Sequence, residues 1–451
     1  MDKKIEDLAQ GELEHKSPEL SQASQTSQTV PADQAPELSA MNTPVAKNWR
    51  SVVVWVWLGQ AVSFVMSGAA GYALVWHLTI TTESPLILML GTAMFFLPMA
   101  LLGPFAGTIA DRYNRKTIMI LSDLGIALAM FIMAFVVIAG MVSIPVVLGA
   151  IALRSIGTAF HQPAMLAVMP LLVPNRHLVR INTLDQGIQA AGNIIAPAIG
   201  IFFYVSIGLQ AVLFIDVIGV LIACLILVIV TIPEYQMSKD QRSTVLGDML
   251  DGFRAVRAVK GMTALFVLFF IGVAAFMPLA SLYPLMTYDF FGGSGFDAAL
   301  VEAIFGSGFL LGSIVLGIWG GGKRLMHVVV ASMVLQGLTF AVIGFLTPTM
   351  FVLFVVLSGV SAIFGAFFNG PLNSIVQRCI PAEKLGRVMA LMGVVTSVAA
   401  PFGLLIAGPI AEVVGMTPWF ILGGVVLVAI SALAVAMPSV RTLDIRGQGS
   451  Q

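Results

Sequence analysis

Long apolar runs separated by short polar segments recur twelve times along the chain. A helix needs about 20 apolar residues to cross a bilayer, and only helices or closed barrels satisfy their backbone groups there. These runs are much longer than barrel strands of roughly 10 residues. The pattern predicts an all-α membrane protein with twelve transmembrane helices, at about 52–79, 86–110, 117–140, 144–171, 181–207, 209–232, 262–288, 299–321, 326–347, 349–377, 385–411 and 416–437.

The polar stretches divide these helices into two groups of six. Residues 1–46 are rich in Gln, Ser, Pro and acids without an apolar stripe, which predicts a disordered tail and no signal peptide. The longest internal polar stretch, 233–261, repeats apolar residues at helical spacing, as expected of an amphipathic helix at the membrane surface. We therefore expect six-helix bundles at 47–232 and 262–437, joined by this linker and followed by a short tail at 438–451.

The basic residues test this topology independently, because short loops rich in Lys and Arg stay in the cytoplasm. With a cytoplasmic N-terminus, every basic residue except Arg154 falls in a cytoplasmic segment. The six outer loops hold none. The alternation predicts that both termini are cytoplasmic, in the inner (plasma) membrane of a bacterium.

Composition agrees with a protein surrounded by lipid. The chain is 58% hydrophobic and 10% charged, where a soluble domain carries about 25% charged residues. Its net charge is zero, which argues against a nucleic-acid partner. The two cysteines, Cys224 and Cys379, form no metal or redox spacing, and we expect neither a metal nor another cofactor.

The two halves also share an internal repeat. The fourth and tenth spans each contain a proline, at Pro163 and Pro371. A second proline lies in the cytoplasmic turn that follows each span, at Pro174 and Pro381. Ala-Pro pairs at 196–197 and 400–401 are read as a third match. Duplicated halves around a site at the midplane are typical of secondary transporters.

One loop carries a more specific signal. Between the second and third spans the sequence is Gly107-Thr-Ile-Ala-Asp111-Arg112-Tyr-Asn-Arg115-Lys116. We expect Gly107 to permit close helix approach, Asp111 to accept hydrogen bonds from a neighbouring helix N-terminus, and the bases to anchor the cytoplasmic face.

This loop resembles the major facilitator signature G-x-x-x-D-R-x-G-R-R/K. The resemblance covers residues 50–437 and implies two pseudo-symmetric bundles, with the loop acting as a conformational switch. Asn114 replaces a glycine, which is a mild departure because Asn also tolerates a positive φ. The corresponding second-half loop keeps Lys323 and Arg324 but lacks the acid, so a latch is expected at the first loop alone.

Two further segments resemble the drug:proton antiporter branch, which includes macrolide and enterobactin exporters. They are Leu58–Ser63 in the first span and Arg154–Ala164 in the fourth. The fifth span matches the antiporter motif G-x-x-x-G-P-x-x-G-G in part, at Gly192, Pro197 and Gly200. These residues, with Pro401, are expected to bend helices, and the resemblance implies proton coupling.

Charged and polar groups inside the spans are candidates for the coupling site. Arg154 lies roughly 16 Å deep and needs a partner or a wet cavity, because an unpaired Arg costs at least ~2.5–3.5 kcal/mol there. Asp216 is the expected partner. Asp123 is expected to pair with a base of the signature loop, and Glu302, near the outer end of the eighth span, to be hydrated. Further cavity candidates, with helix–helix hydrogen bonding as the alternative, are His161, Gln162, Asn369 and Asn373.

These features predict a secondary transporter, and proton-coupled efflux of macrolide-like drugs or other small amphipathic compounds is the leading hypothesis. The alternatives are a dedicated exporter of a siderophore or other metabolite, and a non-transporting membrane sensor on the same fold. Residues 317–323 match the start of a phosphate-binding loop, but no strand precedes them and Arg324 occupies the Ser/Thr position. No enzyme motif is found. The expected partners are a small-molecule substrate, protons and the lipid bilayer, and the chain is expected to be a monomer.

Overall fold

The structure is a computed structural model that describes residues 49–231, 245–322 and 324–443. Within these ranges, every regular element is helical, and twelve helices are long and apolar enough to cross a membrane. The predicted tail at 1–46 and residues 232–244 of the predicted linker lie outside the described residues. The twelve-helix prediction is confirmed.

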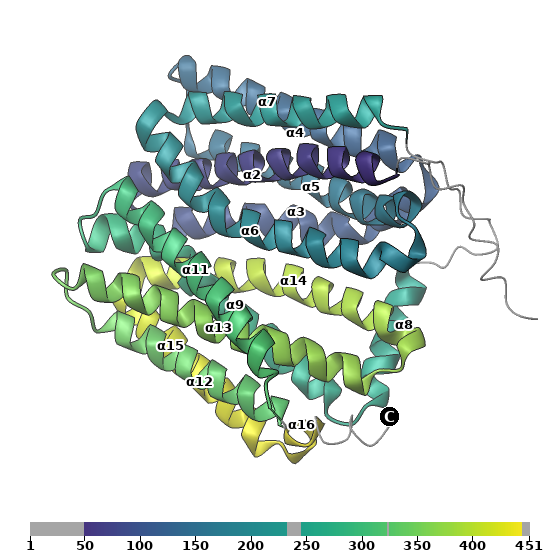
Figure 1. Cartoon of the computed structure of the whole chain (residues 1–451). Helices are drawn as coiled ribbons and strands as arrows, with labels where there is room; N and C mark the ends of the chain where they lie inside the picture. Colours follow the sequence, from purple (N-terminus) through teal and green to yellow (C-terminus); the bar gives the residue numbers. More distant parts are fainter. Residues whose placement is uncertain (1–48, 232–244, 323, 444–451) are drawn as a thin grey trace, which may run out of the picture. The chain divides into compact units, whose positions relative to one another are not determined.

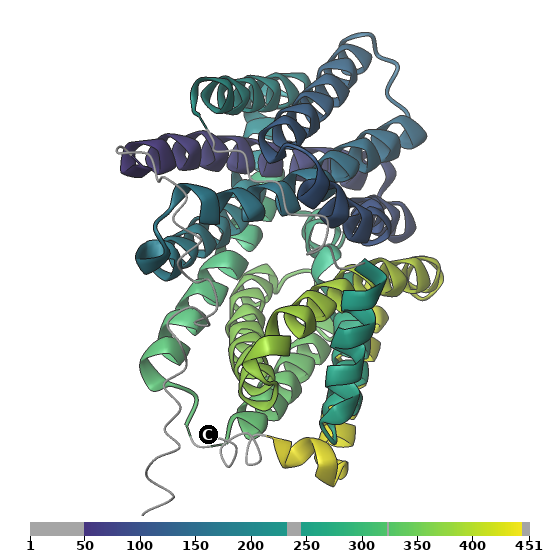
Figure 2. The same ribbon diagram turned by 90° about the vertical axis from the view of Figure 1, so that its right-hand side faces the viewer.

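The first six spans form one group (Figures 1 and 2). Their contacts are mainly with one another: α2 packs on α6 and α7, α3 on α5, and α4 on both α5 and α7. The helices are α2 (Trp49–Thr82), α3 (Pro85–Arg112), α4 (Arg115–Ile138), α5 (Ile144–Leu172), α6 (Asn175–Ile207) and α7 (Leu209–Ile229).

The second group is connected through a short linker helix, α8 (Val245–Ala258), which packs against the start of α14 and places Asp251 3.5 Å from Arg387. Amphipathic spacing in the linker predicted this helix. The remaining elements are α9 (Met262–Ser281), α10 (Tyr283–Leu285), η3 (Met286–Phe290), α11 (Gly295–Trp319), α12 (Leu325–Gly344), α13 (Phe351–Cys379), α14 (Ala382–Val414), α15 (Met416–Ala436) and α16 (Pro438–Arg441).

The internal repeat is visible in helix lengths and caps. Helices α5 and α13 have 29 residues each, α6 and α14 have 33, and α7 and α15 have 21. Pro174 and Pro381 cap α6 and α14, with φ of −58° and −56°. Gly208 joins α6 to α7, and Gly415 joins α14 to α15. Their φ angles are 84° and 94°, a backbone conformation that favours glycine.

Two details differ from the prediction. Pro197 lies 23 residues after Pro174, whereas Pro401 lies 20 residues after Pro381. The third expected match is therefore about one helical turn out of register, because the capping prolines fix the register of α6 and α14. The seventh span is also not one regular helix: it is interrupted near Leu282 by α10 and the π-helical turn η3.

The two groups touch mainly along two helix pairs, α3 with α14 and α6 with α11. Gly408 of α14 lies against Leu86 of α3. The Glu412 carboxylate accepts hydrogen bonds from the Ser84 hydroxyl at 2.8 Å and the Leu86 backbone N–H at 3.1 Å. These contacts join the start of α3 to the last turn of α14.

Candidate functional site

The signature loop connects α3 to α4, and its bases contact the first group of helices. The Arg115 guanidinium donates to the Ala167 carbonyl of α5 at 2.8 Å. Lys116 donates to the Val228 and Val230 carbonyls at 3.1 and 2.9 Å. Carbonyls at a helix C-terminus have no intrahelical partner and carry partial negative charge. Lys116 therefore satisfies the end of α7 and ties it to the start of α4.

The structure explains one departure of this loop from the signature and shows that one expectation for it is wrong. Asn114 has φ −61° and is the N-cap of α4, where its side chain accepts a hydrogen bond from the Thr117 N–H at 3.2 Å. Asn is a favoured N-cap residue, which explains why it is tolerated where the signature has glycine. A Cβ on Gly107 would meet nothing within 4 Å, so no helix approaches closely there. Arg112 is exposed. The Asp111 side chain lies outside the described part of the structure.

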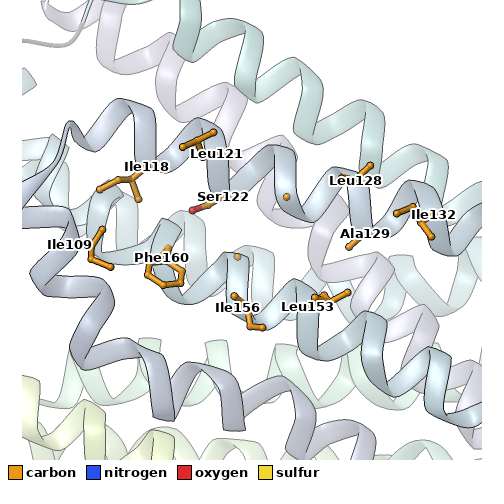
Figure 3. A pocket seen from close by; sticks show the side chains of 12 residues that line it. Ile109, Ile118, Leu121, Ser122, Leu128, Ala129, Ile132, Leu153, Ile156 and Phe160 are labelled. Atoms are coloured by element: carbon orange, nitrogen blue, oxygen red, sulfur yellow. The ribbon is translucent and has the colours of Figure 1, made fainter.

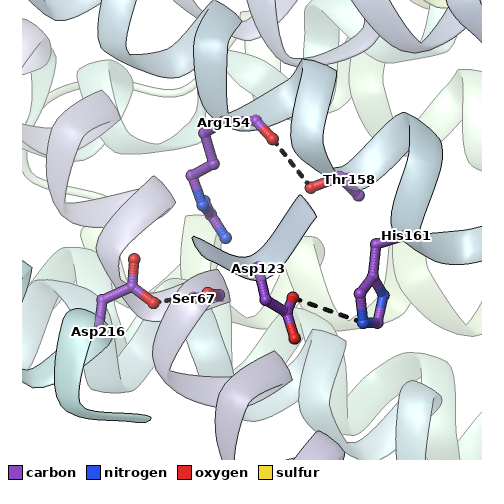
Figure 4. A network of polar contacts seen from close by, with 6 residues as sticks. All are labelled: Ser67, Asp123, Arg154, Thr158, His161 and Asp216. Atoms are coloured by element: carbon purple, nitrogen blue, oxygen red, sulfur yellow. Dashed lines mark hydrogen bonds and ion pairs between the residues drawn. The ribbon is translucent and has the colours of Figure 1, made fainter. Parts of the chain in front are cut away.

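Four titratable side chains gather deep inside the first group (Figure 4). Arg154 of α5 and Asp216 of α7 are buried, with exposed fractions of 5% and 0%. The two side chains interact electrostatically, but no ion pair of 4.0 Å or less joins them in the described structure. The Ser67 hydroxyl of α2 instead donates to the Asp216 carboxylate at 2.5 Å.

The second acid of this cluster pairs with a histidine. Asp123 of α4 is 4% exposed, and its carboxylate lies 3.4 Å from Nε2 of His161 on α5. Gln60 of α2 is a further neighbour of Asp123. The prediction that Asp123 pairs with a base of the signature loop is wrong. Arg115 and Lys116 of that loop instead donate to backbone carbonyls of α5 and α7.

The cluster has more polar groups than it has hydrogen bonds. Within the described structure, buried atoms without a hydrogen-bond partner include Nε and Nη1 of Arg154 and one carboxylate oxygen each of Asp123 and Asp216. One guanidinium and two ionised carboxylates would also leave one negative charge uncompensated. A buried uncompensated charge is costly, so a single bound proton would balance the cluster.

Sequence reasoning missed the residue that admits Arg154. A Cβ on Gly71 of α2 would collide with the Arg154 guanidinium, so glycine leaves the space that this side chain fills. In Figure 4 the Arg154 side chain extends toward the space between Asp216 and Asp123. Gly71 carries no motif signal, and spacing in the sequence alone could not pair it with a residue 83 positions away.

The antiporter-like motif lies where α6 packs on α2. A Cβ on Gly192 would come within 2.6 Å of the Phe64 ring, and one on Gly200 would meet the Ala69 backbone. Between them, Ala196 is accommodated by Gly68 of α2, whose own Cβ would lie 2.6 Å from that of Ala196. Small residues allow such close contacts between membrane helices.

The prolines of these helices are also placed by the structure. Pro197 lies inside α6 and Pro401 inside α14, and both are buried. In α14, two residues beyond Pro401, Gly403 packs against the Ala274 backbone of α9, so each half has a glycine contact between the corresponding helices.

The remaining polar candidates lie apart from the cluster. Gln162 and Asn369 are exposed and Asn373 is half-buried. The Asn369 amide donates to the Gly365 carbonyl of its own helix at 3.0 Å. In the described structure no hydrogen bond or ion pair joins these residues to the Arg154 cluster.

An apolar groove of about 510 Å³ lies between α4 and α5 (Figure 3). Its lining is apolar apart from Ser122, and Leu121, Leu128 and Leu153 in it are 64%, 59% and 57% exposed. In a membrane these side chains face hydrocarbon. We therefore interpret the groove as part of the lipid-facing surface and separate from the charged cluster.

Comparison with known proteins places this geometry in a family. The sequence matches the Major Facilitator Superfamily over residues 56–326 and 265–448. It is 33% identical to Macrolide efflux protein A of Streptococcus pyogenes over 400 residues, covering 88% of this chain and 99% of that protein. It is 34% identical to Macrolide efflux protein A of Enterococcus faecalis over 310 residues, covering 68% and 96%.

A more distant relative is the Multidrug efflux pump Tap of Mycolicibacterium fortuitum, 24% identical over 379 residues, covering 80% of this chain and 89% of that protein. Among solved structures, the nucleoside transporter NupG aligns with a TM-score of 0.69 at 15% identity, covering 86% and 100%. A bacterial homologue of the human lysosomal transporter Spinster aligns with a TM-score of 0.61 at 17% identity, covering 89% and 98%.

The twelve apolar helices, the duplicated halves and the buried charged cluster define a multi-pass membrane transporter. The chain belongs to the Major Facilitator Superfamily, as the family match and the 33% identity over nearly the whole length of a relative show.

Proposed function

We propose that this protein is a secondary transporter that exports macrolide-like and other small amphipathic compounds from the cytoplasm in exchange for protons. The observation that carries the proposal is the 33% identity to Macrolide efflux protein A along almost the entire length of both chains. The similarity to a multidrug efflux pump points in the same direction.

Proton coupling is supported by the buried cluster. Arg154 is buried within α5 and interacts electrostatically with Asp216 of α7, which in turn interacts with Asp123 of α4. Since two carboxylates exceed one guanidinium, the cluster is neutral only with one added proton, which His161 or either acid can hold. Loading and release of this proton would alter the charge where α2, α4, α5 and α7 pack together, and this change in charge would trigger the conformational change.

The proposal extends to topology and to the remaining candidates. The protein lies in a bacterial inner membrane with both termini on the cytoplasmic side. Residues 47–232 and 262–437 move relative to each other as two bundles of a monomer. The signature loop from Gly107 to Lys116 acts as the conformational switch. The glycines of α6 and the prolines Pro197 and Pro401 permit the helices to bend. Gln162, Asn369 and Asn373 would supply polar groups to the substrate path.

The test is transport by the purified protein in proteoliposomes under an imposed pH gradient. Macrolides, dyes and siderophores are offered to the wild type and to Arg154→Ala. We expect macrolide transport that collapses with a protonophore and is lost in the variant. Selective transport of a siderophore would favour the dedicated exporter, and macrolide transport indifferent to the gradient and to Arg154→Ala would refute proton coupling.

A further inference from the structure

The linker helix α8 runs across the ends of the spanning helices (Figure 1). It packs against α14 and also contacts α3 and α9, so it touches both groups of helices. Three residues on this packed side, Gly252, Ala255 and Val256, are buried. A Cβ on Gly252 would lie 3.0 Å from the Arg387 carbonyl oxygen of α14. One side of α8 is therefore fixed against the spans.

The opposite side of α8 carries apolar and basic residues at positions 250, 253, 254 and 257, a spacing that places them on one face of a helix. Leu250 and Phe253 are 46% and 44% exposed, and the Arg254 side chain is 75% exposed. The exposed Arg257 lies over the Phe253 ring, with its guanidinium carbon 5.7 Å from the ring centroid. Lys260, in the turn that follows, is exposed as well. We call these five residues the basic face of α8.

Positive charge is in excess on the basic face. Both acids of α8 precede its bases in the sequence. The second acid, Asp251, is shared between Arg254 at 3.3 Å and Arg387 of α14 at 3.5 Å. Within the part of the chain that the structure describes, no ion pair joins Arg257 or Lys260 to an acid. These two bases are therefore available to an anionic partner.

The turn after α8 places the basic face at the level of the lipid headgroups. Only residues 259–261 separate α8 from α9, and α9 is an apolar spanning helix from its first residue, Met262. Gly261 has φ of 97°, and a Cβ there would collide with the Ser439 backbone, so this turn is tightly packed. Helix α8 therefore ends close to the point where the chain enters the hydrocarbon.

A bilayer surface matches this face better than a soluble protein does. A helix at the interface can bury apolar side chains at the boundary of the acyl chains while its bases pair with anionic headgroups. A stable protein interface buries about 800 Å² on each partner, which is more than one side of this short helix offers.

We propose that the basic face of α8 docks on the bilayer surface and binds the headgroups of anionic phospholipids. Leu250 and Phe253 enter the acyl boundary, and Arg254, Arg257 and Lys260 pair with the lipid phosphates. Because α8 contacts α3 and α14, the bound lipid would also steady the contact between the two groups of helices at this end of the protein.

The experiment places a fluorophore beside the basic face and offers it two lipids. The full-length protein carries Ala258→Cys in a background with Cys224→Ala and Cys379→Ala, is labelled with bimane and is reconstituted in phosphatidylcholine nanodiscs. Phosphatidylglycerol or phosphatidylcholine, each with a nitroxide near the top of one acyl chain, is then added. We expect the anionic lipid to quench the fluorophore at a concentration at least ~5-fold lower than the zwitterionic lipid, and salt to reduce this preference.

Charge variants test whether the basic face causes the preference. Arg254→Gln/Arg257→Gln should abolish it and leave quenching by phosphatidylcholine unchanged. Arg254→Lys/Arg257→Lys, which keeps both charges, should retain most of it. Arg324→Gln, at an exposed base outside α8, is the matched control and should change nothing. If the double Gln variant does not fold by thermal melting, Arg257→Gln alone decides, and it should reduce the preference at least ~2-fold.

Equal quenching by the two lipids in the parent protein would overturn the inference. So would a preference that survives in the Gln variants, or one that is lost equally in Arg324→Gln. Absence of quenching by either lipid would show that the basic face is turned away from the bilayer and open to a soluble protein, which also contradicts the proposal. The measurement needs no transported compound, so a failure of macrolide transport would leave its result standing.

Discussion

At the scale of single residues, the buried charged cluster is organised around Arg154. Its guanidinium fills the space left by Gly71 and faces Asp216, whose other partner is Ser67. Asp123 and His161 complete the cluster at 3.4 Å. The sequence indicated that Arg154 needed a partner. It could not indicate that Asp123 turns toward His161, because helix rotation is set by packing with neighbouring helices.

Gly71→Ala should displace the Arg154 side chain, because the added methyl group occupies the space of the guanidinium. We expect at least ~10-fold slower proton-driven transport at nearly normal membrane levels. Gly103→Ala is the control, since a Cβ at Gly103 meets nothing within 4 Å. Equal rates for both variants in proteoliposomes would show that the position of Arg154 does not matter for transport.

Asp123→Asn should separate proton coupling from substrate movement. The substitution removes one of the two carboxylates, so the cluster becomes neutral without a bound proton. We expect substrate exchange down a substrate gradient to continue, while accumulation driven by a pH gradient falls at least ~10-fold. Retained pH-driven accumulation would assign the proton to another group.

At the scale of elements, the sequence predicted the helices well and their ends less well. Length and apolarity identify each span, since a helix must cross the hydrocarbon. The polar first turns of α6 and α14 hid their true starts at Asn175 and Ala382. The break near Leu282 was missed because the residues around it are as apolar as the rest of the helix. Pro278 and Pro284 flank the break, but a proline alone does not show whether a membrane helix continues past it.

Lys116→Met tests the signature loop as a structural tie. The variant loses two hydrogen bonds from a charged donor to the carbonyls at the end of α7, one exposed and one partly buried, so the loss of stability should be modest. We expect its melting temperature to fall by a few degrees. Arg112→Met, at an exposed base of the same loop, should leave melting unchanged. Equal melting of the two variants would contradict this role of Lys116.

At the scale of the whole molecule, contacts between the halves are concentrated where α3 meets α14 and α6 meets α11. The sequence predicted two halves from its charges and repeats, but not which helices would meet. Glu412 illustrates the difficulty: its two hydrogen-bond donors, at Ser84 and Leu86, are more than 320 residues away along the chain.

Glu412→Ala should loosen this contact. Spin labels at Thr81→Cys and Val413→Cys, in a background without Cys224 and Cys379, should show a distance distribution shifted to longer separations than in the parent protein. Glu383→Gln, at the opposite end of α14, is expected to change nothing. An unchanged distribution for Glu412→Ala would mean that the packing of Gly408 against α3 holds the ends together alone.

We propose that this member of the Major Facilitator Superfamily exports macrolide-like compounds at the expense of a proton gradient. The most direct test of this proposal is macrolide uptake into proteoliposomes in which the protein is oriented with its termini outside and the lumen is acidic. We predict accumulation that stops when a protonophore removes the gradient and that is absent in Arg154→Ala. Accumulation of equal size without the gradient, or no macrolide movement by well-folded wild-type protein, would contradict the account.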